Sequence, residues 1–208
     1  FLIKAIALVC RKPEYQHLKP LLIRHCELLV SRFEESSHPE WIWFEDRLTY
    51  SNGLLPEALL RGYQATGNRA YFDLGRKTLD FLIANTFRDD LYMPIGQLGW
   101  FVRDKERVSF DQQAEDSAAM IQALNTMIET LGGMGTAKIP GDTRDASHYQ
   151  TLMEKCFGWF LGQNVLGQNV YDPATGGCYD GIGHTSLNLN QGAESTISYL
   201  ASRLVFRS

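Results

Sequence analysis

Residues 54–87, LLPEALLRGYQATGNRAYFDLGRKTLDFLIANTF, contain two apolar repeats of helical period on either side of a short polar link. The repeats predict helices over Leu54 to Thr66 and Arg69 to Phe87. The link, Ala65-Thr66-Gly67-Asn68-Arg69, contains Gly67, which suits the left-handed residue that ends many helices. The stretch therefore predicts an antiparallel helical hairpin.

The same apolar spacing recurs along the chain, whereas sustained alternation with Val, Ile and Thr is nearly absent. The chain is therefore predicted to be all-α. Further helices are expected over Leu2 to Arg11, Glu14 to Phe33, Gln113 to Leu131, Ser147 to Asn164 and Gly192 to Phe206. With 208 residues and 44% hydrophobic content, the chain is long enough for one substantial core, so residues 1–208 are treated as one domain.

Three long connections, His38 to Gly53, Asp89 to Gln112 and Val165 to Gln191, are rich in Trp, Tyr, Asp, Asn and Gly. Long structured loops in a compact domain are usually functional. The helix after each loop opens with a related sequence. These openings are Leu55-Pro56-Glu57-Ala58, Gln113-Ala114-Glu115-Asp116 and Gly192-Ala193-Glu194-Ser195. The repeat predicts three stacked hairpins whose helix starts share one rim.

Composition and spacing exclude several functions. The 20 basic and 24 acidic residues are interspersed and give a net charge of -4, which argues against nucleic acid as a partner. The four cysteines have no CxxC spacing, and no Gly-rich phosphate loop precedes a helix, so neither a metal nor a cofactor is expected. The apolar segment Phe1 to Cys10 is too short to span a membrane, and free thiols favour a cytoplasmic protein.

Several motifs together resemble a known group of proteins. The motifs are Trp41-Ile42-Trp43-Phe44-Glu45-Asp46, residues 50–59 (YSNGLLPEAL), Phe110-Asp111-Gln112-Gln113 and Asn190-Gln191-Gly192-Ala193-Glu194-Ser195. They resemble bacterial helical proteins encoded beside, or fused to, glycosyltransferases, within the six-hairpin glycosidase-like superfamily. The resemblance covers nearly the whole chain from Trp41 onward. It implies an (α/α) toroid of helical hairpins and a bacterial, cytoplasmic protein.

A complete toroid of this kind needs more helices than the periodicity of this chain predicts. The expected architecture is therefore a partial or incomplete ring. We expect the chain to be the C-terminal part of a larger ring.

Four carboxylates are the candidate catalytic residues. Glu45 and Asp46 lie in a Trp-rich loop, where lost hydration would raise a carboxyl pKa and suit it to donate a proton. Asp111 and Glu115 lie in the next polar cluster. Glycoside cleavage needs two carboxyl groups across the scissile bond, so Asp46 or Glu45 opposite Asp111 or Glu115 would form such a pair. The alternative is that these acids only cap their helices or favour the helix dipole.

Aromatic rings that can stack on a pyranose, and polar side chains that bond sugar hydroxyls, make up the candidate binding residues. They are Trp41, Trp43, Tyr50, Asn52, Glu57, Gln112, Gln113, Asp172, Tyr179, Asp180, Asn190, Gln191 and Glu194. The alternative is that the Trp residues belong to the core. The loop containing Asp172 lacks the ligand order of a calcium site.

Together with the resemblance, these residues predict a glycoside hydrolase-like domain whose partner is an oligosaccharide or glycan. One alternative is a non-catalytic module that holds a glycan for a partnered glycosyltransferase. Another is a sugar epimerase, for which His184 is the histidine that lies in a candidate site loop. A third is a helical scaffold whose rim packs against further hairpins.

Overall fold

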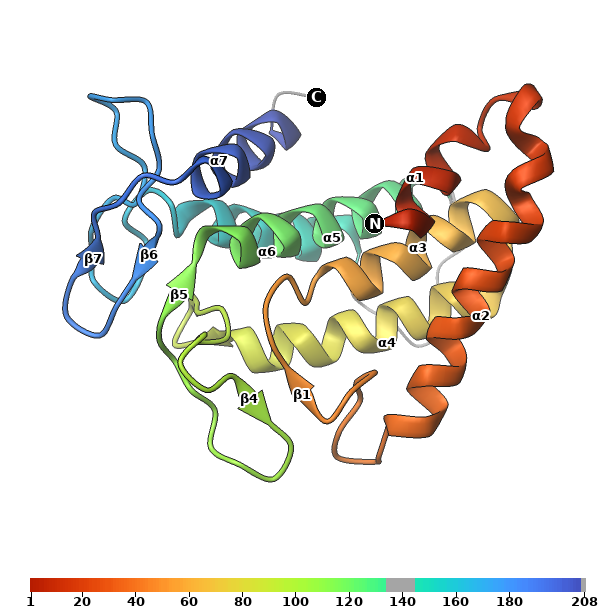
Figure 1. Cartoon of the computed structure of the whole chain (residues 1–208), viewed down its shortest axis with the longest axis horizontal. Coiled ribbons are helices and arrows are strands. Elements are labelled where there is room, and N and C mark those ends of the chain that lie inside the picture. Colours follow the sequence, from red (N-terminus) through yellow and green to blue (C-terminus); the bar gives the residue numbers. More distant parts are fainter. Residues whose placement is uncertain (134–144, 207–208) are drawn as a thin grey trace.

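The computed structural model describes residues 1–133 and 145–206, and this part of the chain is mostly helical (Figure 1). Its α-helices are α1 (Leu2–Val9), α2 (Lys19–Ser36), α3 (Leu54–Thr66), α4 (Arg69–Thr86), α5 (Ala114–Gly133), α6 (Ala146–Gly158) and α7 (Ala193–Val205). A 3₁₀ helix, η1 (Pro13–Leu18), precedes α2. The described strands have two residues each: β1 (Arg47–Leu48), β2 (Phe87–Arg88), β3 (Leu91–Tyr92), β4 (Phe101–Val102), β5 (Gln112–Gln113), β6 (Gly181–Ile182) and β7 (Leu187–Asn188).

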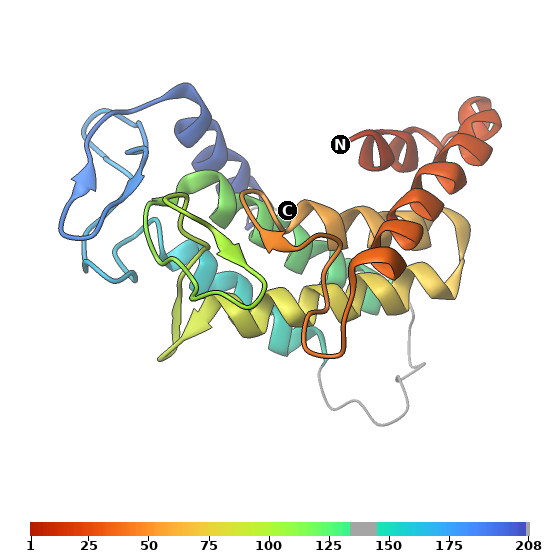
Figure 2. The ribbon, with the colours of Figure 1, turned by 60° about the horizontal axis from the view of Figure 1, so that its bottom comes forward.

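The helices form two layers. Helices α1, α3, α5 and α7 make a curved row in which each packs against the next. Behind this row, α4 packs on α3, α6 packs on α5, and α2 contacts both α1 and α3. Figure 2 shows the row as a curve that opens toward the top of the picture, with α1 and α7 at its two ends. The hydrophobic core lies between the layers and includes the fully buried Leu59, Leu124 and Trp159.

The hairpin predicted from residues 54–87 is confirmed. Gly67 ends α3 in the left-handed conformation, with φ of 74°. The side chain of Asn68 then caps α4 by accepting a hydrogen bond of 3.1 Å from the backbone N–H of Ala70. Gly75 allows the two helices to pack closely, because a Cβ there would lie 3.1 Å from the carbonyl oxygen of Pro56.

Two predicted helices differ from the structure. The helix expected over Glu14 to Phe33 is divided into η1 and α2, because Pro20 lies in the first turn of α2, where its missing N–H is tolerated. The helix expected to reach Asn164 ends at Gly158 instead. There the amide of Asn164 donates to the carbonyl of Trp159, so a side chain replaces the helical hydrogen bond.

The short strands were not predicted, because two residues are too few to produce an alternating pattern. They tie the long loops together. In β5–β6, Gln112 pairs with Ile182 and Gln113 with Gly181, which joins the start of α5 to the loop ahead of α7. Strands β1 and β4 join the other two long loops. A Cβ at Gly181 would lie 2.3 Å from the carbonyl oxygen of Gln112, so this pairing requires glycine.

None of the helices in residues 1–133 and 145–206 combines the length and the apolar character needed to cross a membrane.

Candidate functional site

A cavity of about 260 Å³ lies at the N-terminal ends of α5 and α7. The strands that pair the two preceding loops bring acidic residues from separate segments to its wall. Its polar lining residues are Asp111, Gln113, Glu115, Asp180, Asn188, Glu194 and Ser195. All seven come from the motifs or loops that the sequence singled out around Asp111, Asp180 and Glu194, so this cavity is the candidate site.

Glu115 is the half-buried carboxyl at the centre of this group. Burial raises its pKa to about 7, and both repulsion by Glu194 and a hydrogen bond with that carboxyl add to the effect. A hydrogen bond from Ser51 acts in the opposite direction. Glu115 can therefore hold or release a proton near neutral pH.

Asp111 is the second carboxyl of the cavity with a raised pKa, and burial is the cause. Its Oδ1 atom is buried and has no hydrogen-bond partner among the described residues. A buried acceptor without a partner is costly, so a ligand group that donates to Asp111 would remove that cost.

Asp180 has a structural role in the same cavity. Its carboxylate accepts hydrogen bonds from the N–H of Gly192 (2.7 Å), from the hydroxyl of Ser195 (2.8 Å) and from the amide of Asn190. Burial alone would raise its pKa, but these hydrogen bonds hold the pKa below its ordinary value. Asp180 therefore stays ionised and caps the start of α7, and Asn190, predicted as a sugar contact, supports this cap.

Asp116, which was not among the predicted site residues, also shapes the site. It is buried, and its carboxylate accepts hydrogen bonds from the N–H of Ser51 (2.7 Å) and from the amide of Gln97 (3.2 Å). These bonds hold the loop ahead of α3 against the start of α5. Ser51 is thereby placed next to Glu115.

Glu45 and Asp46 do not line this cavity. Both are exposed, and Asp46 pairs with the neighbouring Arg47 at 2.9 Å. The hydrogen bond from Arg47 lowers the pKa of Asp46, which is opposite to the rise expected from a Trp-rich loop. Neither Asp46 nor Glu45 therefore faces Asp111 or Glu115 across this cavity, contrary to the predicted pairing.

The tryptophans of that loop are core residues. Trp41 packs edge-on against Phe81 and Phe101, and Trp43 packs against Phe44. Both indoles are buried, so neither offers a face to a sugar, contrary to the prediction. Tyr50, in contrast, is 56% exposed.

Two of the predicted amides are engaged inside the protein. Gln112 is fully buried, accepts a hydrogen bond from the indole N–H of Trp159 and donates to the carbonyl of Ser109. Asn52 is buried and closes a turn by bonding both backbone groups of Thr49. Neither amide faces the cavity, so their predicted role in sugar binding is replaced by a structural one. Gln113 does line the cavity.

The loop ahead of β6 is held together by Asp172. Its carboxylate accepts hydrogen bonds from the hydroxyls of Thr175 and Tyr179 and from the amide of Gln191. A backbone hydrogen bond from Ala174 is the main reason that the pKa of Asp172 is lowered. Asp172, Tyr179 and Gln191, all predicted sugar contacts, therefore stabilise the loop.

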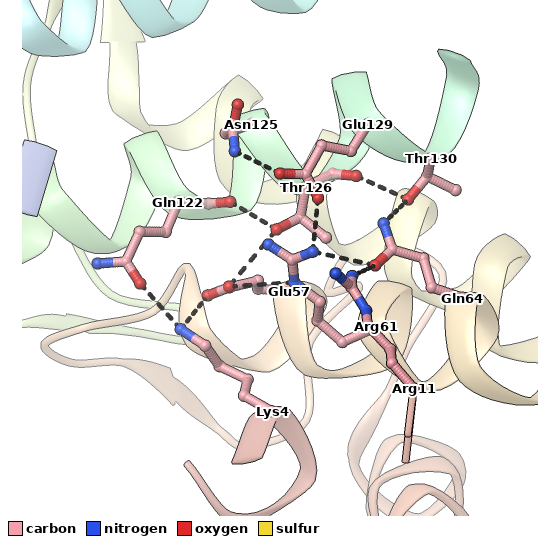
Figure 3. A network of polar contacts seen from close by, with 10 residues as sticks. All are labelled: Lys4, Arg11, Glu57, Arg61, Gln64, Gln122, Asn125, Thr126, Glu129 and Thr130. Carbon is pink, nitrogen blue, oxygen red and sulfur yellow. Dashed lines mark hydrogen bonds and ion pairs between the residues drawn. The ribbon is translucent and has the colours of Figure 1, made fainter. Parts of the chain in front are cut away.

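Glu57, the third glutamate of the repeat, lies in a different cavity on the concave side (Figure 3). It is only 2% exposed and forms ion pairs with Lys4 at 2.6 Å and Arg61 at 3.8 Å. The repeat therefore brings together two of its three glutamates, Glu115 and Glu194. No sequence motif identified Lys4 or Arg61 as the ion-pair partners of Glu57.

Next to Asp111, the ring of Phe110 stacks on the exposed His184 with a centroid separation of 5.0 Å. In the described part of the chain, no group of three or more His, Cys, Asp or Glu side chains is arranged to hold a metal ion. No family model matches the chain, and no curated protein matches its sequence. A functional proposal therefore rests on the chemistry of the cavity, which combines Glu115, with a pKa of about 7, and Asp111, whose buried Oδ1 atom has no partner among the described residues.

Proposed function

We propose that this chain is a carbohydrate-active domain that acts on a glycan by general acid and base catalysis at the cavity between α5 and α7. The observation that carries the proposal is that Asp111, Glu115 and Glu194 line one cavity, where Glu115 has a pKa of about 7. A carboxylic acid that is protonated near neutral pH can donate a proton to a leaving oxygen.

The two carboxyls proposed for catalysis are Glu115 and Asp111. Glu115 and Glu194 are in hydrogen-bonding contact. They are too close to flank a glycosidic bond, since the two catalytic carboxyls of glycosidases are about 5 Å or more apart. We assign Glu194 to keeping Glu115 protonated and Asp111 to the role of base or nucleophile. This pair replaces the pairing of Asp46 with Asp111 that the sequence favoured.

We also propose that the helices form part of an (α/α) toroid. The alternation of α1, α3, α5 and α7 in one layer with α2, α4 and α6 in the other supports this arrangement.

A second candidate is a sugar epimerase, and the position of His184 supports it. His184 stacks on Phe110, which directly precedes Asp111, so the imidazole lies against the segment that carries Asp111, although His184 does not line the cavity. Epimerisation needs proton transfer at a sugar carbon, for which histidine is suited. The two reactions yield different products: hydrolysis releases a new reducing end, whereas epimerisation leaves the number of sugar units unchanged.

The test is to incubate the protein with a glycan panel and analyse the products by mass spectrometry and NMR. Glu115→Gln and Asp111→Asn are each expected to lower turnover of a converted glycan by at least about 100-fold. Glu35→Gln, at an exposed position on α2, is the matched control and should leave turnover unchanged. Full turnover in Glu115→Gln would refute the proposed acid. Binding without any product would instead favour the glycan-holding module.

A further inference from the structure

A second cavity, with a volume of about 600 Å³, lies on the concave side of the helix row. Its walls come from α1, α3 and α5, with Val205 at the end of α7. It shares no lining residue with the carboxylate cavity. Along α5, the lining residue nearest to Glu115 is Gln122, seven residues beyond it, which corresponds to about 10 Å of helix. The two cavities are therefore separate sites.

The carboxylates of this cavity are already neutralised by cations of the protein. Glu57 accepts a hydrogen bond of 2.6 Å from Lys4, and Glu129 accepts one of 2.5 Å from Arg61 (Figure 3). Arg61 also lies 3.8 Å from Glu57, so it links the two carboxylates. An incoming anion would consequently meet two paired acids rather than two free negative charges.

Arg11 supplies one positive charge in excess of these pairs. The cavity is lined by three cations, Lys4, Arg11 and Arg61, and by two carboxylates. Arg11 is exposed, and its guanidinium makes a single long hydrogen bond of 3.4 Å with Gln64. Within residues 1–133 and 145–206 it forms no ion pair. A guanidinium in this state can bind a carboxylate or phosphate with two parallel hydrogen bonds.

Two amides on α5 provide neutral polar groups beside this charge. Gln122 accepts a hydrogen bond of 2.9 Å from Lys4 through its oxygen, and its amide nitrogen has no partner among the described residues. Asn125 donates to Glu129 at 2.9 Å, and its amide oxygen has no partner in the same part of the chain. One free donor and one free acceptor suit hydroxyl groups, which both donate and accept.

We propose that this cavity binds a small hydroxylated anion, namely a sugar unit that carries one carboxylate or phosphate group. Arg11 binds the anionic group, and Gln122 and Asn125 bind hydroxyls of the same molecule. The cavity is large enough for a ligand of this size, since small-molecule pockets have volumes of about 300–1,000 Å³. Binding here does not depend on catalysis at Glu115.

The test is isothermal titration calorimetry of the whole chain with glucuronate, glucose 6-phosphate, glucose and inorganic phosphate. At least one sugar anion is expected to bind, and glucose and inorganic phosphate should each bind at least tenfold more weakly. The two sugar anions distinguish a carboxylate from a phosphate as the preferred group. The proposal fails if neither sugar anion binds, or if glucose or inorganic phosphate binds as tightly as the better sugar anion.

Variants locate the binding. Arg11→Gln is expected to weaken binding of the preferred sugar anion at least tenfold, and Gln122→Leu to weaken it while leaving the circular dichroism spectrum unchanged. Arg24→Gln, an exposed arginine on α2, is the matched control and should retain the affinity. Glu115→Gln should also bind normally, which separates this proposal from the proposed catalysis. Undiminished binding in Arg11→Gln would overturn the assignment.

Discussion

The carboxyl groups of Glu115 and Glu194 are in hydrogen-bonding contact at the N-terminal ends of α5 and α7, each in the first turn of its helix. Two carboxylates at this separation repel each other when both are ionised, so the pair favours a state that retains one proton. The positive ends of the helix dipoles reduce this repulsion. Burial of Glu115 further disfavours its ionised form and so raises its pKa. Burial of Glu115 and, to a smaller extent, this contact explain why the pKa of Glu115 is raised to about 7.

Stability should therefore depend on pH through Glu115. Its pKa is raised from 4.5 to about 7 in the folded state, so its stabilising effect is complete below about pH 4.5 and is lost as the pH rises through 7. From pH 5 to pH 8 the free energy of unfolding of the wild type should fall by roughly 1–2 kcal/mol more than that of Glu115→Gln. This value is smaller than the full pKa shift implies, because solvent screens a half-buried group. Urea unfolding at the two pH values measures the difference.

Glu194→Gln provides the companion measurement. It removes the neighbouring charge, so the pKa of Glu115 should fall toward its ordinary value and the pH dependence of stability should shrink. NMR titration of the Glu115 side-chain carboxyl carbon would follow this pKa directly. An unchanged titration midpoint would mean that burial alone, without Glu194, sets the pKa.

The ion pair between Lys4 and Glu57 predicts a coupling between α1 and α3. Lys4→Met leaves the buried Glu57 with only the distant Arg61 as a cation and should destabilise the protein by about 1–3 kcal/mol. The double variant Lys4→Met/Glu57→Gln should lose less unfolding free energy than the sum of the two single variants, because it contains no unpaired buried charge. Denaturant unfolding of the four proteins in the cycle measures this coupling. Additive effects would contradict it.

A matched control for this cycle is the exposed pair of Arg69 and Asp73 on α4. Because both side chains lie in solvent, Arg69→Met should change stability by no more than about 0.5 kcal/mol. A larger effect would mean that the loss in Lys4→Met reflects a general cost of removing a cation.

The sequence predicted the helices well because each follows from local spacing and capping. Leu54–Thr66 has the predicted bounds, since Gly67 and Asn68 mark the hairpin by themselves. The division of the helix near Pro20 also had a local signal that the apolar spacing did not include, because a proline is tolerated in the first turn of a helix and not in its interior. The two-residue strands depend on pairing between loops about 70 residues apart, such as Gln113 with Gly181.

The site was predicted in part. The shared glutamates of the repeat pointed to Glu115 and Glu194, which do meet, because α5 packs against α7 and both helices begin at the same cavity. The same repeat misplaced Glu57, whose partners on α1 and within α3 are set by tertiary packing. Residue type alone also misassigned Trp43, since a large aromatic residue suits a core as well as a sugar-binding surface.

Gly181 is expected to be intolerant of a side chain. In Gly181→Ala the new Cβ would lie 2.3 Å from the carbonyl oxygen of Gln112, so β5 and β6 must separate. We expect a loss of about 2 kcal/mol or more in unfolding free energy, as for other overpacked buried positions. Gly132→Ala, near the end of α5 with no atom within 4 Å of its Cβ, is the control and should stabilise the protein by about 0.5–1 kcal/mol. Equal stability of both variants would contradict the close approach.

Asp180 should act as a cap for α7 rather than as a catalytic base. In Asp180→Ala the N–H of Gly192 and the hydroxyl of Ser195 lose their acceptor, so stability should fall by about 1 kcal/mol, the usual cost of losing an N-terminal cap. Amide hydrogen exchange should accelerate in the first turn of α7 and remain unchanged in α3. Because hydrogen bonds lower the pKa of Asp180, its contribution is present above pH 3.8, its ordinary value, and is lost as the pH falls through the folded value. Asp73→Asn, on the exposed face of α4, is the control. Unaltered amide hydrogen exchange in α7 of Asp180→Ala would refute the capping role and leave Asp180 free to act on substrate.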